Sequence, residues 1–187
     1  MKKIKLSKSS LGDLEKRAVQ RILEGEFLGM GQEVGYFEAE LTNFLGRPAV
    51  CVATGTAALH LALQAIELQP GDEVLVQSLT YVASFQAIVA AGAIPVACDI
   101  HPDSLAINLA DAQAKLSPKT KAIMPVYYAG KPQQVDEITK FARINNLRII
   151  EDSAHAFGSR HRGQLVGSFG DITCFSFDGI KNITSGE

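Results

Sequence analysis

The sequence lacks any long, uninterrupted apolar run. Its most apolar stretch, Val82–Val96, contains four interruptions, at Ser84, Gln86, Gly92 and Pro95. A membrane-spanning helix needs about 20 predominantly apolar residues, so the sequence predicts no transmembrane segment. The charged N-terminus has no apolar run behind it, which argues against a signal peptide. We therefore expect a soluble protein with no membrane partner.

The sequence also lacks an excess of charge of either sign. It has 18 Lys and Arg against 20 Asp and Glu, a net charge of −2 and a pI near 6.1. Electrostatic binding to nucleic acid or anionic lipid needs a strong basic excess, so neither is expected as a partner. The only basic cluster, at Lys2, Lys3, Lys5 and Lys8, fits a solvated arm better than a binding site.

Cysteine is scarce, with three residues at Cys51, Cys98 and Cys174. The count is odd, and each lies inside an apolar segment typical of a strand. This pattern favours buried, reduced thiols over disulfides or a metal site, and we predict no bound metal. A reducing, cytoplasmic location fits best.

The 187 residues, 47% of them hydrophobic and 20% charged, are enough for a sizeable core. Short β-branched runs alternate with helical patterns, which predicts a mostly parallel sheet in a three-layer α/β/α fold. The expected strands are Ala49–Ala53, Glu73–Gln77, Ile94–Cys98, Lys121–Tyr127, Leu147–Asp152 and Asp171–Phe175. The expected helices are Leu11–Glu24, Glu33–Leu45, Thr56–Ile66, Tyr81–Ala91, Leu109–Leu116 and Gln133–Asn145.

Residues that follow the expected strands are read together, because ligands of parallel sheets bind at the carboxyl ends of strands. The turn at Gly55 and Thr56 opens directly into a helix, whose free amides would bind a phosphate. The alternative is a simple helix N-cap. Tyr81, after the next strand, would stack on a planar ring or else pack at a helix start.

Three more residues carry chemistry. Asp152 ends a buried strand, where a carboxylate needs a cation or a hydrogen-bond donor. His155 would orient that partner or bind a phenolate oxygen, and the alternative is an ordinary core imidazole. Lys181 follows a strand and a turn, and a lysine so placed is a candidate amine nucleophile, although a solvated surface lysine is the alternative.

One cofactor accounts for all these residues together, namely pyridoxal 5′-phosphate (PLP). Its phosphate would bind at Gly55, Thr56 and Ser176, and its ring against Tyr81. Its pyridinium nitrogen would meet Asp152 and its aldehyde Lys181.

The sequence resembles the DegT/DnrJ/EryC1/StrS aminotransferases, PLP enzymes of the aspartate aminotransferase fold type. The resemblance runs from about Phe27 to the last residue. It depends on the order and spacing of Thr54–His60 with Pro70–Val74, Thr80–Ser84, Glu151–Ala156, Gly170–Asp171, Phe175–Phe177 and Lys181–Glu187. It implies amino transfer to a nucleotide-linked keto-sugar, with glutamate as the amino donor.

The resemblance also implies residue roles. Lys181 forms the internal aldimine and shuttles a proton, and Asp152 keeps the ring nitrogen protonated. Related sugar dehydratases have histidine at the position of Lys181, so the lysine favours transamination. Family members often have asparagine at Gln86 and histidine near Tyr127, which puts substrate contacts there in doubt.

The implied domain organisation has two parts. Residues 1–32 form an N-terminal helix and glycine loop on the substrate side, and residues 33–187 form an incomplete PLP-binding large domain. Family members are roughly twice as long, as two-domain chains are. Their small C-terminal domain is absent here, as is the strand that normally lies between Ala49–Ala53 and Asp171–Phe175. Full-length members form homodimers in which a second subunit contributes to each site.

Other interpretations remain. The chain could be a truncated, inactive PLP-binding remnant or a fragment that needs its C-terminal half. A dinucleotide-binding dehydrogenase shares the fold class, but its glycine fingerprint is missing and it gives Lys181 no role. PLP enzymes acting on cysteine or glycine fit the spacing around Phe175–Phe177 less well.

Overall fold

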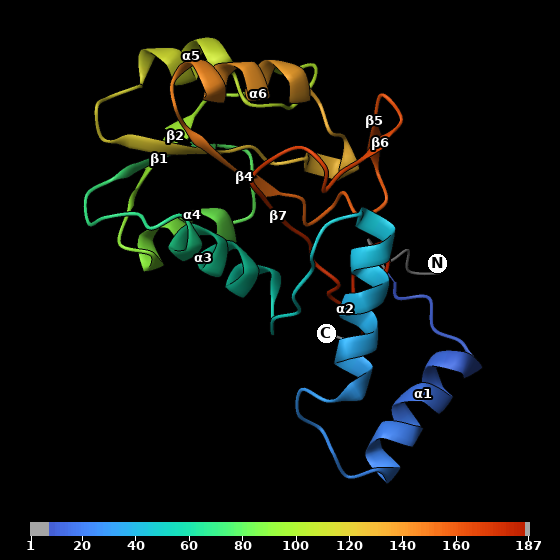
Figure 1. Cartoon of the computed structure of the whole chain (residues 1–187). Coiled ribbons are helices and arrows are strands. Elements are labelled where there is room, and N and C mark those ends of the chain that lie inside the picture. Colours follow the sequence, from blue (N-terminus) through green and yellow to red (C-terminus); the bar gives the residue numbers. More distant parts are fainter. Residues whose placement is uncertain (1–7, 186–187) are drawn as a thin grey trace, which may run out of the picture.

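A computed structural model describes residues 8–185 and shows a parallel sheet between two layers of helices (Figure 1). The sheet has five strands in the order β2-β1-β3-β4-β7, and all their pairings are parallel. The strands are β1 (Glu73–Gln77), β2 (Ile94–Cys98), β3 (Thr120–Met124), β4 (Arg148–Asp152) and β7 (Ile172–Cys174). The predicted three-layer α/β fold is confirmed.

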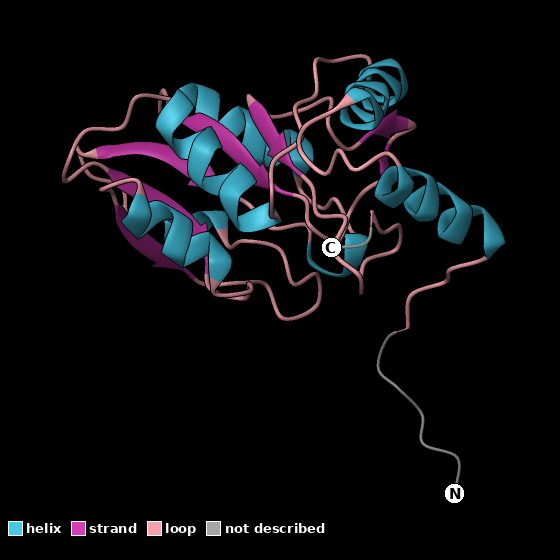
Figure 2. Ribbon diagram, turned by 90° about the horizontal axis from the view of Figure 1, so that it is seen from below, coloured by secondary structure: helices cyan, strands magenta, loops and turns pink. Residues whose placement is uncertain are grey.

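Helices cover both faces of the sheet (Figures 1 and 2). Helices α3 (Gly55–Ala65) and α4 (Ala83–Ala90) lie on one face, and α5 (Leu109–Ala114) and α6 (Val135–Ile144) on the other. Successive side chains of a strand point to opposite faces, so β1 contributes Val74 and Val76 to the core under α3 and α4, and Leu75 to the core under α5 and α6. The near-continuous apolar strands follow from this two-sided burial.

The predicted strand at Ala49–Ala53 was wrong. The segment runs outside the described sheet, and side chains of α2 (Gln32–Leu45) bind its backbone amides instead. The Ala49 amide donates to Thr42 Oγ1 at 3.1 Å and the Cys51 amide donates to Glu38 Oε1 at 2.7 Å. A strand exists only beside a partner, and within residues 8–185 no strand lies between this segment and β7.

The cysteine prediction was right for two of the three residues. Cys98 and Cys174 are buried, whereas Cys51 is only half-buried because it lies in the segment outside the sheet. All three are free thiols. Burial raises the pKa of Cys98 to about 11 and that of Cys174 to about 12, so both stay protonated at neutral pH.

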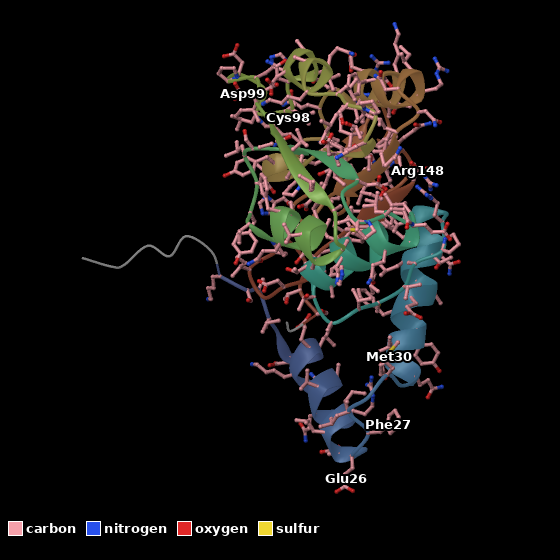
Figure 3. All side chains as sticks on the ribbon, turned by 90° about the vertical axis from the view of Figure 1, so that its left-hand side faces the viewer. Glu26, Phe27, Met30, Cys98, Asp99 and Arg148 are labelled. Carbon is pink, nitrogen blue, oxygen red and sulfur yellow. The ribbon has the colours of Figure 1, made fainter. Side chains whose placement is uncertain are left out.

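Helix α1 (Asp13–Glu24) and α2 form an arm that extends from the sheet (Figure 1). The glycine loop that joins them lies at the far tip, where Phe27 and Met30 are exposed (Figure 3). Three short elements were not predicted: η1 (Tyr128–Gly130), β5 (Arg160–His161) and β6 (Gln164–Leu165). Two or three residues carry too little periodicity to be recognised in a sequence. None of the described helices combines the length and apolarity that crossing a membrane requires.

A buried carboxylate ties three strands together on the α6 face of the sheet. Glu151 in β4 is 1% exposed and accepts hydrogen bonds from the hydroxyls of Tyr127, just after β3, and Thr173, in β7. The Thr173 bond measures 2.5 Å. Burial and the neighbouring carboxylate raise the pKa of Tyr127, so its hydroxyl remains a donor. Glu151 thus fixes the carboxyl ends of β3, β4 and β7 relative to one another.

Replacing Tyr127 by Phe should destabilise the fold by about 1–3 kcal/mol, because it removes a donor from a buried carboxylate. The measurement is the free energy of unfolding in urea. Tyr36→Phe is the matched control: this exposed hydroxyl should contribute less than about 0.5 kcal/mol. Equal unfolding free energies for the two variants would contradict the role given to Glu151.

Candidate functional site

Asp152 is the last residue of β4 and points to the α3 and α4 side of the sheet, opposite to Glu151. It is 6% exposed. Its Oδ2 accepts a hydrogen bond from Ser84 Oγ at 2.6 Å, and its Oδ1 accepts one from the Ala154 amide at 3.3 Å. Across residues 8–185, no lysine or arginine forms an ion pair with it. Neutral donors therefore orient this carboxylate, which keeps lone pairs for a cationic partner.

His155 and Lys181 lie within electrostatic reach of each other. His155 is exposed but partly desolvated, and this partial desolvation is the main cause that lowers its pKa. The Lys181 ammonium lowers the pKa further, while the Asp152 carboxylate raises it. The imidazole is consequently neutral at pH 7. Its ring also contacts the Tyr128 ring edge-on, with centroids 5.8 Å apart. The three residues that the sequence analysis singled out for chemistry are thus grouped in one place.

A tight turn holds Lys181. Its amide donates to the Asp178 carbonyl at 2.9 Å, and the Ile180 amide donates to Asp178 Oδ1 at 2.9 Å. The next side chain, Asn182, donates to the Phe157 carbonyl at 3.0 Å and fastens the turn to the loop after β4. Lys181 itself is half-buried, and its role as an amine nucleophile stays a prediction.

The two phenylalanines of the segment Phe175–Phe177 pack against a third aromatic ring. The Phe157 ring meets the rings of Phe175 and Phe177 with centroids 5.3 and 5.0 Å apart. Ser176, between them, lies against Gly55 in the first turn of α3. A Cβ on Gly55 would come within 3.2 Å of Ser176 Cβ, so glycine allows this close approach.

The start of α3 provides free amides beside Ser176. Thr54 is the N-cap, and its hydroxyl accepts a hydrogen bond from the Ala57 amide at 3.0 Å. The amides of Gly55 and Thr56 belong to the first turn and have no intrahelical acceptor. Free amides, a helix N-terminus and the Ser176 hydroxyl together make a cradle suited to an anion. Sequence reasoning found Gly55 and Thr56 but missed the capping role of Thr54, which the Thr-Gly-Thr order already suggested.

Tyr81 stands just before α4 and is 76% exposed, so the alternative of a ring packed at the helix start is wrong. It lies between Thr80 and Ser84, whose hydroxyls are 2.7 Å apart. Both residues were missed as parts of the site. Their spacing of four residues was the available signal, but only the fold reveals that Ser84 faces Asp152.

The structure locates the two positions at which this sequence departs from the family's usual residues. Tyr127 is buried and donates a hydrogen bond to Glu151, whereas Gln86 is exposed on α4. The glycine loop at the tip of the arm is distant from the sheet in Figure 1, and its contact with a substrate stays a prediction.

Comparison with known proteins identifies one family and several similar enzymes. The family model described as "DegT/DnrJ/EryC1/StrS aminotransferase family" matches residues 9–187. A GDP-perosamine synthase of Escherichia coli O157:H7 is 42% identical over 190 residues, covering 100% of this chain and 52% of the relative. A dTDP-4-dehydro-2,3,6-trideoxy-D-glucose 4-aminotransferase of Saccharopolyspora spinosa is 38% identical, covering 98% and 49%. The chain therefore spans about half the length of these relatives.

Solved structures agree. The PLP form of a putative sugar aminotransferase, Spr1654, from Streptococcus pneumoniae matches with a TM-score of 0.92 and 33% identity, covering 98% of this chain and 51% of that one. PseC from Helicobacter pylori, an aminotransferase involved in the biosynthesis of pseudoaminic acid, matches with a TM-score of 0.93 and 30% identity, covering 100% and 51%. Other structures of Spr1654 are a PMP form and an apo form.

These findings confirm the predicted resemblance, the fold type and PLP as the cofactor of the family. The glycine cradle, the buried carboxylate and the lysine lie in the half of the relatives that this chain spans. The chain belongs to the DegT/DnrJ/EryC1/StrS aminotransferase family.

Proposed function

We propose that the protein is a PLP-dependent aminotransferase that transfers an amino group, with glutamate as donor, to a nucleotide-linked keto-sugar. The observation that carries this proposal is that the hydrogen bond from Asn182 to the Phe157 carbonyl brings the Lys181 turn to the loop that follows Asp152 at the carboxyl end of β4. The named relatives support the substrate class, because one is a GDP-perosamine synthase and another acts on a dTDP-linked dehydro-sugar.

The residues present fit the cofactor. The close approach of Gly55 to Ser176 leaves a cradle that a Cβ would fill, with free amides for a phosphate. Asp152 is buried, oriented and free of a cationic partner among the described residues, as a site for a protonated ring nitrogen requires. When bound, PLP supplies an electron sink for the substrate carbon.

Each of the predicted site residues then has a role toward the cofactor. The amides of Gly55 and Thr56 and the hydroxyl of Ser176 would hold the phosphate, and Tyr81 would offer a ring face. The Asp152 carboxylate would accept a hydrogen bond from a protonated ring nitrogen.

The remaining two residues act at the aldehyde side of the cofactor. The Lys181 amine would hold the aldehyde of the cofactor and, once an incoming substrate amine has displaced it, would be free to act as a base that moves a proton. Neutral His155 is suited to bind the phenolic oxygen, because a neutral imidazole both donates and accepts.

The wider setting is proposed from the resemblance. A homodimer in the cytoplasm would complete the site, and its product would enter amino-sugar and polysaccharide biosynthesis. The division into a substrate-side segment, residues 1–32, and a cofactor-binding domain, residues 33–187, belongs to the same proposal.

A second candidate is a chain that binds PLP without turnover. It is favoured by the free edge of β7, which has no neighbouring strand in the described part of the chain. An assay of the 187-residue chain, alone and fused to the matching C-terminal half of the perosamine synthase, separates the two. Turnover by the fusion but not by the chain alone would show that this chain supplies the cofactor chemistry. The C-terminal half of the perosamine synthase would then supply the substrate contacts.

Replacing Lys181 by Ala in the active form should lower turnover about 10²–10⁴-fold, because the amine that moves the proton is gone. The measurement is glutamate-dependent amination of a nucleotide-linked keto-sugar. Lys140→Ala, on the exposed side of α6, is the matched control and should retain activity. Equal turnover in the two variants would overturn the role of Lys181.

The grouping itself is testable without cofactor. Lys181→Met removes a nearby positive charge and should raise the pKa of His155 toward its ordinary value. Asp152→Asn should lower the pKa further. Because the folded pKa is depressed, His155 should contribute stability above pH 6.5 that is lost as the pH falls toward the folded pKa.

The measurement for these variants is histidine titration by NMR. Lys140→Met, which also removes one positive charge, should leave the His155 titration unchanged. A His155 pKa that ignores Lys181 would show that the two side chains do not share a site.

A further inference from the structure

We propose that Ser84 is a positioning residue that orients the Asp152 carboxylate and donates a hydrogen bond to it, with Thr80 as the donor behind Ser84. The inference deepens the proposed function and rests on it, since its effect is exerted on a bound PLP ring. Neither residue touches the cofactor in this account. Both act through the Asp152 carboxylate.

The direction of the hydrogen bonds follows from proton counting. Ser84 Oγ lies 2.6 Å from Asp152 Oδ2, and an ionised carboxylate only accepts, so the single hydroxyl proton of Ser84 is donated to Asp152. The Ser84 oxygen is then the acceptor for the Thr80 hydroxyl at 2.7 Å. The result is a short chain of donors that runs from Thr80 through Ser84 to Asp152.

Burial strengthens this series of hydrogen bonds. Ser84 is fully buried and Asp152 nearly so, and hydrogen bonds to charged groups are strengthened where water is excluded. The only other donor to the Asp152 carboxylate in the described structure is the Ala154 amide, at the longer distance of 3.3 Å. A serine in a helix commonly bonds back to its own helix backbone. Ser84 instead reaches a residue 68 positions away.

The same segment also carries Tyr81. This residue follows Thr80, and the Ser84 amide donates to its carbonyl at 3.2 Å. The Thr80–Ser84 bond therefore closes a turn that presents the Tyr81 ring and, at its other end, aims a donor at Asp152. This short segment would thus provide the ring that stacks on the cofactor and would also orient the carboxylate that contacts the cofactor's ring nitrogen.

The consequence concerns the proton between the ring nitrogen and Asp152. A donor to the carboxylate stabilises its anion and keeps that proton on the nitrogen. Without Ser84 the carboxylate becomes more basic and the proton shifts toward it, which weakens the electron sink. Turnover should then fall roughly tenfold or more, as expected for the loss of one hydrogen bond to a charged group.

The test is nitrogen-15 NMR of PLP labelled at the ring nitrogen and bound to the full protein at a fixed pH. The unchanged protein should give the shift of a protonated pyridine. S84A should move the shift toward that of a neutral pyridine, in the direction of D152N, and S84T should restore it. S117A is the matched control, because Ser117 also donates to a carboxylate, Glu73, but at the opposite end of the strands.

The outcomes separate the two proposals. A bound, protonated ring that is identical in S84A and in the unchanged protein would overturn the role of Ser84 and leave the proposed function standing. Failure of the unchanged protein to bind PLP would overturn both. Should S84A not fold, T80V decides: a smaller shift in the same direction supports the donor chain, and an unaltered shift contradicts it.

Discussion

The last two residues of β4 impose the constraint on which the rest of this structure depends. Glu151 and Asp152 are both buried carboxylates, and adjacent strand residues point to opposite faces, so each needs its own donors. Glu151 takes them from Tyr127 and Thr173 in the strand ends on either side. Asp152 takes one from Ser84 in α4. The hydrogen bonds of these two buried carboxylates thus fix three strands and a helix at the edge where a ligand of a parallel sheet binds.

The other parts of the site are assembled onto that edge by packing. Phe157 gathers the rings around Ser176, which places this serine against Gly55, while Asn182 fastens the Lys181 turn to the Phe157 carbonyl. Phe37 and Phe44 on α2 extend the same aromatic cluster to the arm. Apolar contacts therefore bring Ser176 and the Lys181 turn to the edge that the two carboxylates fix.

Much of this was predictable from sequence, and the failures have physical reasons. The site residues after β1, β4 and β7 follow from one rule, that parallel strands end at a common edge. Ala49–Ala53 has the composition of a strand, yet a strand needs a partner, and Thr42 and Glu38 take its amides instead. Ser84 looked like an interruption in an apolar stretch. Only the fold shows that it faces Asp152, because that contact joins residues far apart in the chain.

The central claim is that this chain builds a PLP site around Lys181. The most direct measurement is to mix the protein with PLP, reduce with borohydride, and map the cofactor-bearing peptide by mass spectrometry. The account predicts label on the peptide that contains Lys181. Label that is absent, or scattered over the exposed lysines, would contradict it.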